Sequence, residues 1–281
     1  MTLREYISAA KARLVVAGIA PPEAARDVLL LAMHALGWSR AAIHARDTEP
    51  PPADFPAVYA ARVDRRTRRE PMAYITGVQE FWNRDFAVSP SVLIPRPETE
   101  LIIEEALSCA FGLAADIGTG SGCLAVTLAA EVPRARIVAT DISPEALATA
   151  RANAERHKVA DRIEFREAAY LDGVPGPFDL IVANPPYVTE AEYAGLAPDV
   201  RDYEPRTALA AGADGLRDVR EILARATTSL QPGGLLLMEI GYGQADAVRE
   251  LVAATRGLTL TRISPDLQGI LRVAVVEHLS T

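Results

Sequence analysis

The sequence predicts an α/β fold with a mostly parallel sheet, preceded by a small helical domain. Three observations carry this prediction. From residue 113 onward, apolar runs typical of strands alternate with helical stretches, whereas residues 1–77 show only helical spacing. A glycine-rich turn follows the first of the apolar runs. Alternation of this kind builds a parallel sheet with helices on both faces, and ligands gather at its carboxyl edge.

Composition is that of a globular protein. The chain has 281 residues, of which 49% are hydrophobic and 23% charged, enough for one large domain and a small one. The net charge of −8 argues against tight nonspecific binding to nucleic acid, although it leaves room for a local basic patch.

Cysteine and histidine usage predicts neither a disulfide framework nor a metal site. The two cysteines could form one bridge, but a chain of this length without a Cys framework indicates a reducing compartment. The four histidines lack metal-ligand spacing. We find no secretory signal and no apolar stretch that could span a membrane, so we expect a soluble, cytoplasmic protein without a membrane partner.

Residues 1–77 are predicted to form a helical domain of three helices. The first carries apolar residues at helical spacing from Leu3 to Leu14, the second starts at Pro22 and stops at Gly37, and the third covers 53–69. Five arginines lie within 62–69. The plain interpretation is a solvated helix face, and the alternative is a partner-binding patch.

Residues 78–95 predict a β-hairpin that links this domain to the next, with a turn at 83–85. Residues 96–281 form the second predicted domain. Its expected strands cover 113–117, 136–140, 163–166, 178–183, 234–240, 258–263 and 270–277. Its expected helices cover 123–131, 144–157, 215–229 and 244–255. Prolines at 95 and 97 prevent a continuous helix there, so Pro97 or Thr99 would open the next one.

The glycine turn after the first strand suits a nucleoside cofactor. Its cofactor-binding candidates are Gly118, Thr119, Gly120, Ser121 and Gly122. Glycines let the backbone turn sharply and approach a ligand closely. The dinucleotide fingerprint would place its third glycine at the next position, which is a cysteine. The spacing D-x-G-x-G-x-G instead resembles the cofactor loop of class I S-adenosylmethionine methyltransferases; the plain alternative is a structural turn.

Two further cofactor-binding candidates follow the next two strands. Asp141 lies 19 positions after Gly122, where a carboxylate can accept both ribose hydroxyls. Its alternative role is a helix cap, but Ser143, followed by Pro144, is the better cap. Tyr170 follows the third strand and could lie beside adenine, or could equally be a core or surface tyrosine.

The sequence Asn184-Pro185-Pro186-Tyr187 follows the fourth strand and predicts a clamp for a planar group bearing an NH2. An amide nitrogen is a poor nucleophile because its lone pair is delocalised. Asn184 Oδ1 and the Pro185 carbonyl can each accept one N–H and so orient the nitrogen, while Tyr187 offers a flat face. Catalysis by positioning is therefore expected from Asn184, Pro185 and Tyr187. The plain alternative is an ordinary proline turn.

With these residues in place, the chain resembles the HemK/PrmC family of peptide chain release factor glutamine methyltransferases over most of its length. Matching segments lie at 71–77, 81–82, 93–100, 116–122, 141, 184–187, 204–205, 212–216 and 266–269. The segment Pro-Arg-Pro-Glu-Thr-Glu at 95–100 is the most specific of these. The Asn-Pro-Pro-Tyr motif also occurs in methyltransferases that act on adenine in DNA or guanine in rRNA.

The resemblance implies a class I methyltransferase domain with a Rossmann-like seven-stranded sheet, and S-adenosyl-L-methionine as cofactor. The acceptor would be the glutamine of the Gly-Gly-Gln loop of class I release factors, giving N5-methylglutamine. Residues 184–187 would bind that glutamine, Asn184 would also lie near the methionine end of the cofactor, and residues 1–77 would dock the release factor. Ala169 departs from the family, which often has an acidic residue suited to the adenine amino group there.

Three other functions remain open from the sequence. The first is an enzyme that methylates an exocyclic amine of adenine or guanine in DNA or rRNA, because such an amine is also an NH2 conjugated to a π-system. The second is a non-catalytic protein that only docks on release factors. The third is a dinucleotide oxidoreductase, which the cysteine at the third glycine position opposes.

Overall fold

The computed structural model describes residues 1–279 and divides into two compact units. The smaller unit comprises Met1–Gly77 together with Ala197–Tyr203. The larger unit comprises Val78–Leu196 and the chain from Glu204 onward. Within the described residues, no helix is both long and apolar enough to cross a membrane.

The smaller unit is helical, as the sequence predicts. Its helices are α1 (Leu3–Val16), α2 (Pro21–Leu36), α3 (Arg40–Ala45), α4 (Phe55–Thr67) and α5 (Met72–Thr76). The short helices α3 and α5 were not predicted. Helix α2 ends where Gly37 adopts a φ of +64°. Burial of side chains such as Phe55 and Leu31 contributes roughly 1.5–3 kcal/mol each.

The arginines of α4 are not simply a solvated face. Arg66 is only 2% exposed, and its Nε donates to Asp27 at 2.7 Å. Its guanidinium also pairs with Glu23. The prediction of a solvated face is therefore wrong for Arg66, whereas Arg68 is exposed. Sequence spacing could not reveal this, because the partner carboxylates come from α2.

A segment distant in sequence completes the smaller unit. Helix α10 (Pro198–Arg201) carries Asp199, which accepts from Arg69 at 3.4 Å. The Tyr203 hydroxyl donates to the backbone oxygen of Arg68 at 2.6 Å. The chain between β6 (Phe178–Ala183) and β7 (Leu230–Glu239) therefore contributes structure to the helical unit.

The larger unit opens with the predicted hairpin. Strand β1 (Val78–Phe81) pairs antiparallel with β2 (Arg84–Ala87). The turn is formed by Trp82 and Asn83, both with positive φ, so the expected turn at 83–85 is displaced. Phe81 and Phe86 are buried in the core of this unit.

The main sheet has seven strands in the order β5-β4-β3-β6-β7-β9-β8. They are β3 (Leu113–Ile117), β4 (Arg136–Asp141), β5 (Ile163–Glu167), β6 (Phe178–Ala183), β7 (Leu230–Glu239), β8 (Leu258–Pro265) and β9 (Leu271–His278). Strands β3 to β7 are parallel, and β9 runs antiparallel to both β7 and β8. This confirms the predicted sheet. The main boundary difference is that β7 starts at Leu230 rather than Gly234.

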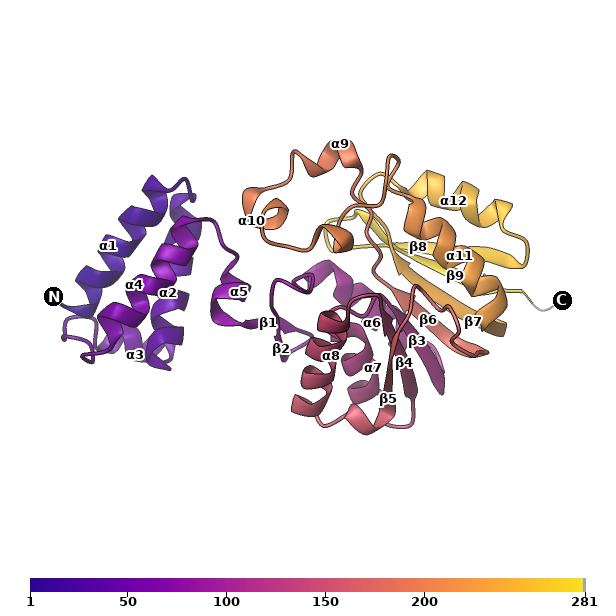
Figure 1. Ribbon diagram of the computed structural model, residues 1–281, viewed down its shortest axis with the longest axis horizontal. Coiled ribbons are helices and arrows are strands. Elements are labelled where there is room, and N and C mark those ends of the chain that lie inside the picture. Colours follow the sequence, from indigo (N-terminus) through magenta and orange to yellow (C-terminus); the bar gives the residue numbers. More distant parts are fainter. Residues whose placement is uncertain (280–281) are drawn as a thin grey trace. The chain divides into compact units, whose positions relative to one another are not determined.

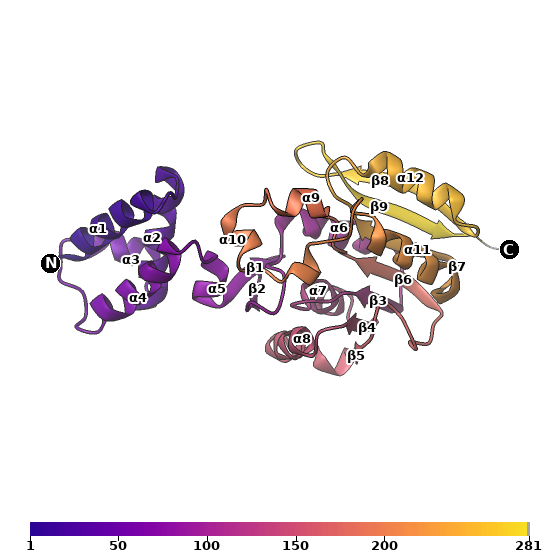
Figure 2. The same ribbon diagram turned by 45° about the horizontal axis from the view of Figure 1, so that its top comes forward.

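Helices cover both faces of the sheet (Figures 1 and 2). One face packs against α6 (Glu100–Leu107), α7 (Cys123–Glu131) and α8 (Pro144–Arg156). The other packs against α11 (Arg217–Ser229) and α12 (Ala245–Ala254). Remaining short elements are α9 (Glu190–Tyr193), η1 (Pro97–Thr99), η2 (Ala160–Arg162) and η3 (Arg206–Ala208). The chain runs outward from β3 through β4 to β5 and returns to β6, so the switch point lies between β3 and β6.

Replacing Arg66 by alanine is expected to destabilise the helical unit by about 3–5 kcal/mol, because the buried Asp27 would lose its hydrogen-bonded partner and keep only the exposed Arg26 at 3.8 Å. Hydrogen exchange resolved by peptide would show lost protection in α2 and α4. The matched control is Arg68→Ala, which changes an exposed side chain of the same type and should shift stability by about 0.5 kcal/mol or less. Equal protection in the two variants would contradict the structural role of Arg66.

Candidate active site

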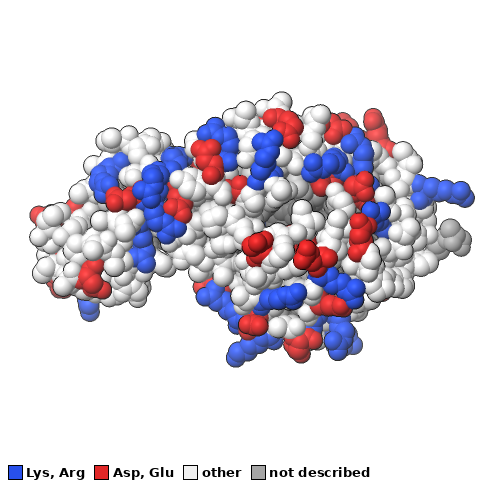
Figure 3. Space-filling view, in the orientation of Figure 1, with Lys and Arg blue, Asp and Glu red and all other residues white. Residues whose placement is uncertain are grey.

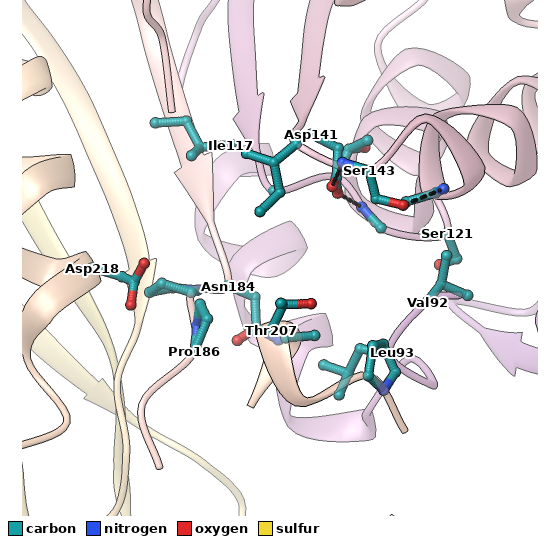
Figure 4. A pocket seen from close by; sticks show the side chains of 18 of the residues that line it. Val92, Leu93, Ile117, Ser121, Asp141, Ser143, Asn184, Pro186, Thr207 and Asp218 are labelled. Atoms are coloured by element: carbon teal, nitrogen blue, oxygen red, sulfur yellow. Dashed lines mark hydrogen bonds between the residues drawn. The ribbon is translucent and has the colours of Figure 1, made fainter. Parts of the chain in front are cut away.

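A cavity of about 510 Å³ opens at the carboxyl edge of the sheet, at the switch point. Figure 3 shows the hollow on one face of the larger unit, and Figure 4 shows it from close by. Its walls come from the ends of β3, β4, β5 and β6, from residues 91–95 and from residues 205–210. Asp141 and Ser143 lie across the cavity from Asn184 and Pro186 (Figure 4).

The glycine turn forms one wall. Gly118, Thr119, Gly120 and Ser121 all line the cavity. Gly122 does not, although it was predicted with them. A Cβ at Gly122, which has a φ of +80°, would lie 3.0 Å from the Cβ of Ala150 in α8. This glycine therefore permits close packing of the turn against a helix, and its role in binding the cofactor stays a prediction.

Asp116 at the base of this turn was missed as a site residue. It is 1% exposed, and its Oδ2 accepts from Thr119 Oγ1 at 2.6 Å and from Ala125 N at 3.1 Å. Its Oδ1 is buried and has no hydrogen-bond partner among the described residues. Burial raises the pKa of Asp116 to about 7. A carboxylate inside an otherwise apolar strand was the signal available in the sequence.

Asp141 and Tyr170 both line the cavity, as expected. Asp141 accepts from Gly120 N through Oδ2 and from Ser143 N through Oδ1, each at 2.9 Å. Each carboxylate oxygen keeps a lone pair that can accept a hydroxyl. Ser143 caps α8 through Ala146 N, as predicted.

Tyr170 is fixed from two sides. It has a φ of +52°, and its hydroxyl donates to Asp218 at 2.8 Å. Burial and Asp218 raise its pKa to about 12. The neighbouring Ala168 and Ala169 also line the cavity, so no acidic side chain stands directly before Tyr170.

Asn184, Pro185 and Pro186 line the cavity opposite the glycine turn. The Asn184 amide is held by its nitrogen, because Nδ2 donates to Thr99 Oγ1 at 2.9 Å. The Thr99 hydroxyl in turn donates to Glu239 Oε2 at 2.7 Å. Neither Thr99 nor Glu239 was predicted as a site residue, although a glutamate ending an apolar strand was a visible signal.

Tyr187 is not part of the cavity lining. Its ring packs beside Gly241, and its backbone oxygen accepts from Gln244 Nε2 at 3.3 Å. A Cβ at Gly215 would lie 2.5 Å from that oxygen, so the chain is packed closely here. Burial raises the pKa of Tyr187 to about 12, which keeps the phenol protonated near neutral pH.

Residues 94–100 connect the cavity rim to two other segments of the larger unit, around Glu204 and Trp82. The Arg96 guanidinium pairs with Glu204, which is 5% exposed and also accepts from Ile94 N at 3.1 Å. Glu100 accepts from Trp82 N at 2.7 Å. These contacts connect two of the segments that match the family in sequence, 93–100 and 204–205.

These residues fit a nucleoside that carries an amino-acid tail. Asp141 offers acceptors to ribose hydroxyls, the glycine turn admits close backbone approach, and Asp116 Oδ1 is an unpaired buried acceptor for a cation such as an ammonium group. A ligand site at the switch point is shared by doubly wound nucleotide-binding folds, and within them these residues fit the class of S-adenosylmethionine-dependent methyltransferases. Residues 97–197 match the family described as "Methyltransferase small domain", and residues 5–77 match "PrmC N-terminal domain".

Curated relatives define the family more closely. The release factor glutamine methyltransferase of Cereibacter sphaeroides is 45% identical over 269 residues, covering 96% of each chain. The protein of the same name from Koribacter versatilis is 43% identical over 281 residues, covering 98% of each. This chain belongs to the family of release factor glutamine methyltransferases, and its cofactor is S-adenosyl-L-methionine.

Solved structures support the fold alone. The catalytic domain of hMettl16, solved with the MAT2A 3'UTR hairpin 6, has a TM-score of 0.54 at 17% identity, covering 79% of this chain and 82% of that one. The predicted family, fold and cofactor are confirmed. The roles of individual site residues stay predictions.

Affinity for S-adenosylhomocysteine is expected to fall below about pH 7, by up to about tenfold per pH unit. In the protein without ligand, the pKa of the Asp116 carboxyl is raised to about 7. Only the ionised carboxylate can pair with the ligand's ammonium group. Isothermal titration between about pH 6 and pH 8 measures this. Asp116→Asn should bind more weakly and lose the pH dependence. A wild-type affinity that is flat across this range would contradict the assignment.

Proposed function

We propose that this protein transfers a methyl group from S-adenosyl-L-methionine to the side-chain amide of the glutamine in the Gly-Gly-Gln loop of class I peptide chain release factors. The products are N5-methylglutamine and S-adenosylhomocysteine. Membership of the family supports the substrate. The observation that carries the chemistry is the orientation of Asn184, whose amide nitrogen is bound to Thr99.

When bound, the cofactor supplies an electrophilic methyl group on its sulfonium. The chain's own residues then act by positioning. Asn184 Oδ1 and the Pro185 carbonyl accept the two N–H groups of the substrate amide and turn its nitrogen toward the cofactor side of the cavity. The nitrogen lone pair would form the new N–C bond as the bond between the methyl carbon and sulfur breaks, its electron pair remaining on the sulfur of S-adenosylhomocysteine, and the nitrogen would then lose one proton to solvent. Pro185 fixes its own φ, which keeps its carbonyl in place.

The cofactor is proposed to lie between the glycine turn and Asn184. In this arrangement Gly118, Thr119, Gly120 and Ser121 approach it through the backbone, while Asp141 accepts its ribose hydroxyls. Tyr170, held by Asp218, would flank the adenine in place of an acidic residue at Ala169. Asp116 would meet the ammonium group.

Two predicted residues act differently in this proposal. Gly122 shapes the turn through its contact with α8. Tyr187 supports the clamp from behind, because its ring packs against Gly241 and it does not line the cavity. That the Tyr187 ring provides a flat face for the substrate amide remains a prediction.

The helical domain, residues 1–77, is proposed to dock the release factor, with the hairpin and its continuation at 78–95 as the link to the catalytic domain. Figure 3 shows basic side chains gathered on the helical unit, where α4 carries Arg62 and Arg65 and Arg68 follows its end. No direct partnership with nucleic acid is proposed. A cytoplasmic location belongs to this proposal, because release factors act in translation.

The alternative, methylation of adenine or guanine in nucleic acid, has less support. The likeness to hMettl16 concerns the fold and leaves the substrate open. The net charge of −8 and the names of the curated relatives both favour a protein substrate.

Incubation of a purified class I release factor with this protein and S-adenosylmethionine should add one methyl group to the loop glutamine, detected by peptide mass spectrometry. Asn184→Ala should slow transfer about 100- to 1,000-fold, because one acceptor that orients the nitrogen is lost. Binding of S-adenosylhomocysteine should persist in that variant.

The control substrate is a release factor whose loop glutamine is replaced, which should receive no methyl group. Transfer to DNA or rRNA instead of the release factor would reject the proposal. Tight release factor binding without any methyl transfer would favour a docking protein.

A further inference from the structure

We propose that Thr99 and Glu239 are positioning residues that determine which end of the Asn184 amide faces the substrate. The inference rests on the proposed function for its effect on rate. It concerns Thr99, which lines the cavity beside Asn184, and Glu239, which lies outside the lining; neither need touch the transferred methyl group.

The three residues form a short chain of hydrogen bonds between three elements. Thr99 ends η1, Glu239 ends β7, and Asn184 follows β6. Thr99 is 1% exposed and Glu239 is 2% exposed, so bulk water does not compete for their hydrogen bonds. The bond from Thr99 to Glu239 is 2.7 Å and that from Asn184 to Thr99 is 2.9 Å.

The direction of these bonds follows from counting protons. An ionised carboxylate has no proton, so the Thr99 hydroxyl must donate its single proton to Glu239. The Thr99 oxygen can then only accept, and its partner on Asn184 must be the NH2 group. No described group donates to Asn184 Oδ1, which is left for the substrate. If the Asn184 amide were flipped, its NH2 group would face the substrate N–H, and two donors cannot form a hydrogen bond.

The charge state of Glu239 therefore sets the orientation. Burial raises its pKa to about 7. The groups that face it come from several elements. Thr99, Arg96 and Arg272 favour the ionised form, whereas Glu98 favours the protonated form. The partly buried Tyr187 and Cys123 also interact with Glu239 and remain neutral, since each has a pKa raised to about 12.

Protonation of Glu239 would release the constraint. A protonated carboxyl can donate to the Thr99 oxygen, and the Thr99 hydroxyl is then free to donate to Asn184 Oδ1. That arrangement stabilises the flipped amide. Turnover at saturating cofactor is therefore expected to fall as pH decreases through about 7, by up to about tenfold per pH unit. Glu239→Gln should lose this pH dependence.

The first test compares Thr99→Val with Thr99→Ser in release factor methylation at saturating cofactor. Valine keeps the shape but removes the hydroxyl, and kcat should fall about 100-fold as the amide loses its fixed direction. Serine should restore the rate to within about threefold of wild type. Binding of S-adenosylhomocysteine should be unchanged in both variants.

The chain provides a matched control in Thr127 of α7. This threonine is also fully buried, but its hydroxyl has no hydrogen-bond partner among the described residues. Thr127→Val removes a buried hydroxyl from the same domain without touching the network, and should leave turnover unchanged. Wild-type turnover in Thr99→Val would overturn the inference, provided that the wild-type protein methylates the release factor.

The second test needs no substrate and so separates this inference from the proposed function. The side-chain NH2 resonances of Asn184 can be assigned by NMR from their absence in Asn184→Asp. In the wild-type protein they should shift with a midpoint near pH 7, and in Glu239→Gln they should not. Resonances that do not respond to pH in the wild type would overturn the inference, whatever the protein methylates.

Discussion

The hydroxyl of Thr99 has one proton, and the geometry of the substrate side of the cavity depends on where that proton goes. Strands β6 and β7 are parallel neighbours in which Ala183 is opposite Met238. The next residue on each strand, Asn184 and Glu239, therefore emerges at the same edge of the sheet. Thr99 bridges the two from η1. Because a carboxylate can only accept, Glu239 fixes the direction of both hydrogen bonds: Thr99 donates to Glu239, and Asn184 donates to Thr99 through its nitrogen. The Asn184 side-chain oxygen is therefore the atom left for a ligand.

Other residues of the segment around Thr99 also connect the cavity rim to the larger unit. Its charged and polar side chains each bond to a different part of the larger unit, Arg96 to Glu204 and Glu100 to the backbone of Trp82. A buried ion pair contributes little net stability compared with an apolar pair, but losing one partner costs several kcal/mol. Removal of Arg96 would therefore leave Glu204, which is 5% exposed, without its charged partner.

Sequence reasoning located the strands, the glycine turn, Asp141 and Asn184, because each depends on local pattern: apolar runs, backbone freedom and position at a strand end. It missed what depends on a distant partner. Burial of Arg66 needs carboxylates from α2, and the place of residues 197–203 in the helical unit needs contacts with α4. Gly122 and Tyr187 adjoin lining residues in sequence but lie outside the cavity lining, where they pack against Ala150 and Gly241, a placement that local pattern did not reveal. The unpaired oxygen of Asp116 is visible only in three dimensions.

Asp116, which lines the cavity, and Glu239, which lies outside its lining, are two buried carboxyls whose pKa values are both raised to about 7 by burial. A raised pKa means that the folded state binds the proton more tightly than the unfolded chain. The stabilisation is full below the unfolded pKa values and is lost as pH rises through about 7. Glu239 has Arg96 and Arg272 nearby to offset its charge, whereas the structure provides Asp116 with no cation. A ligand with an ammonium group would supply a positive charge beside Asp116. Pairing with this charge would stabilise the buried carboxylate and so contribute to the affinity for the cofactor.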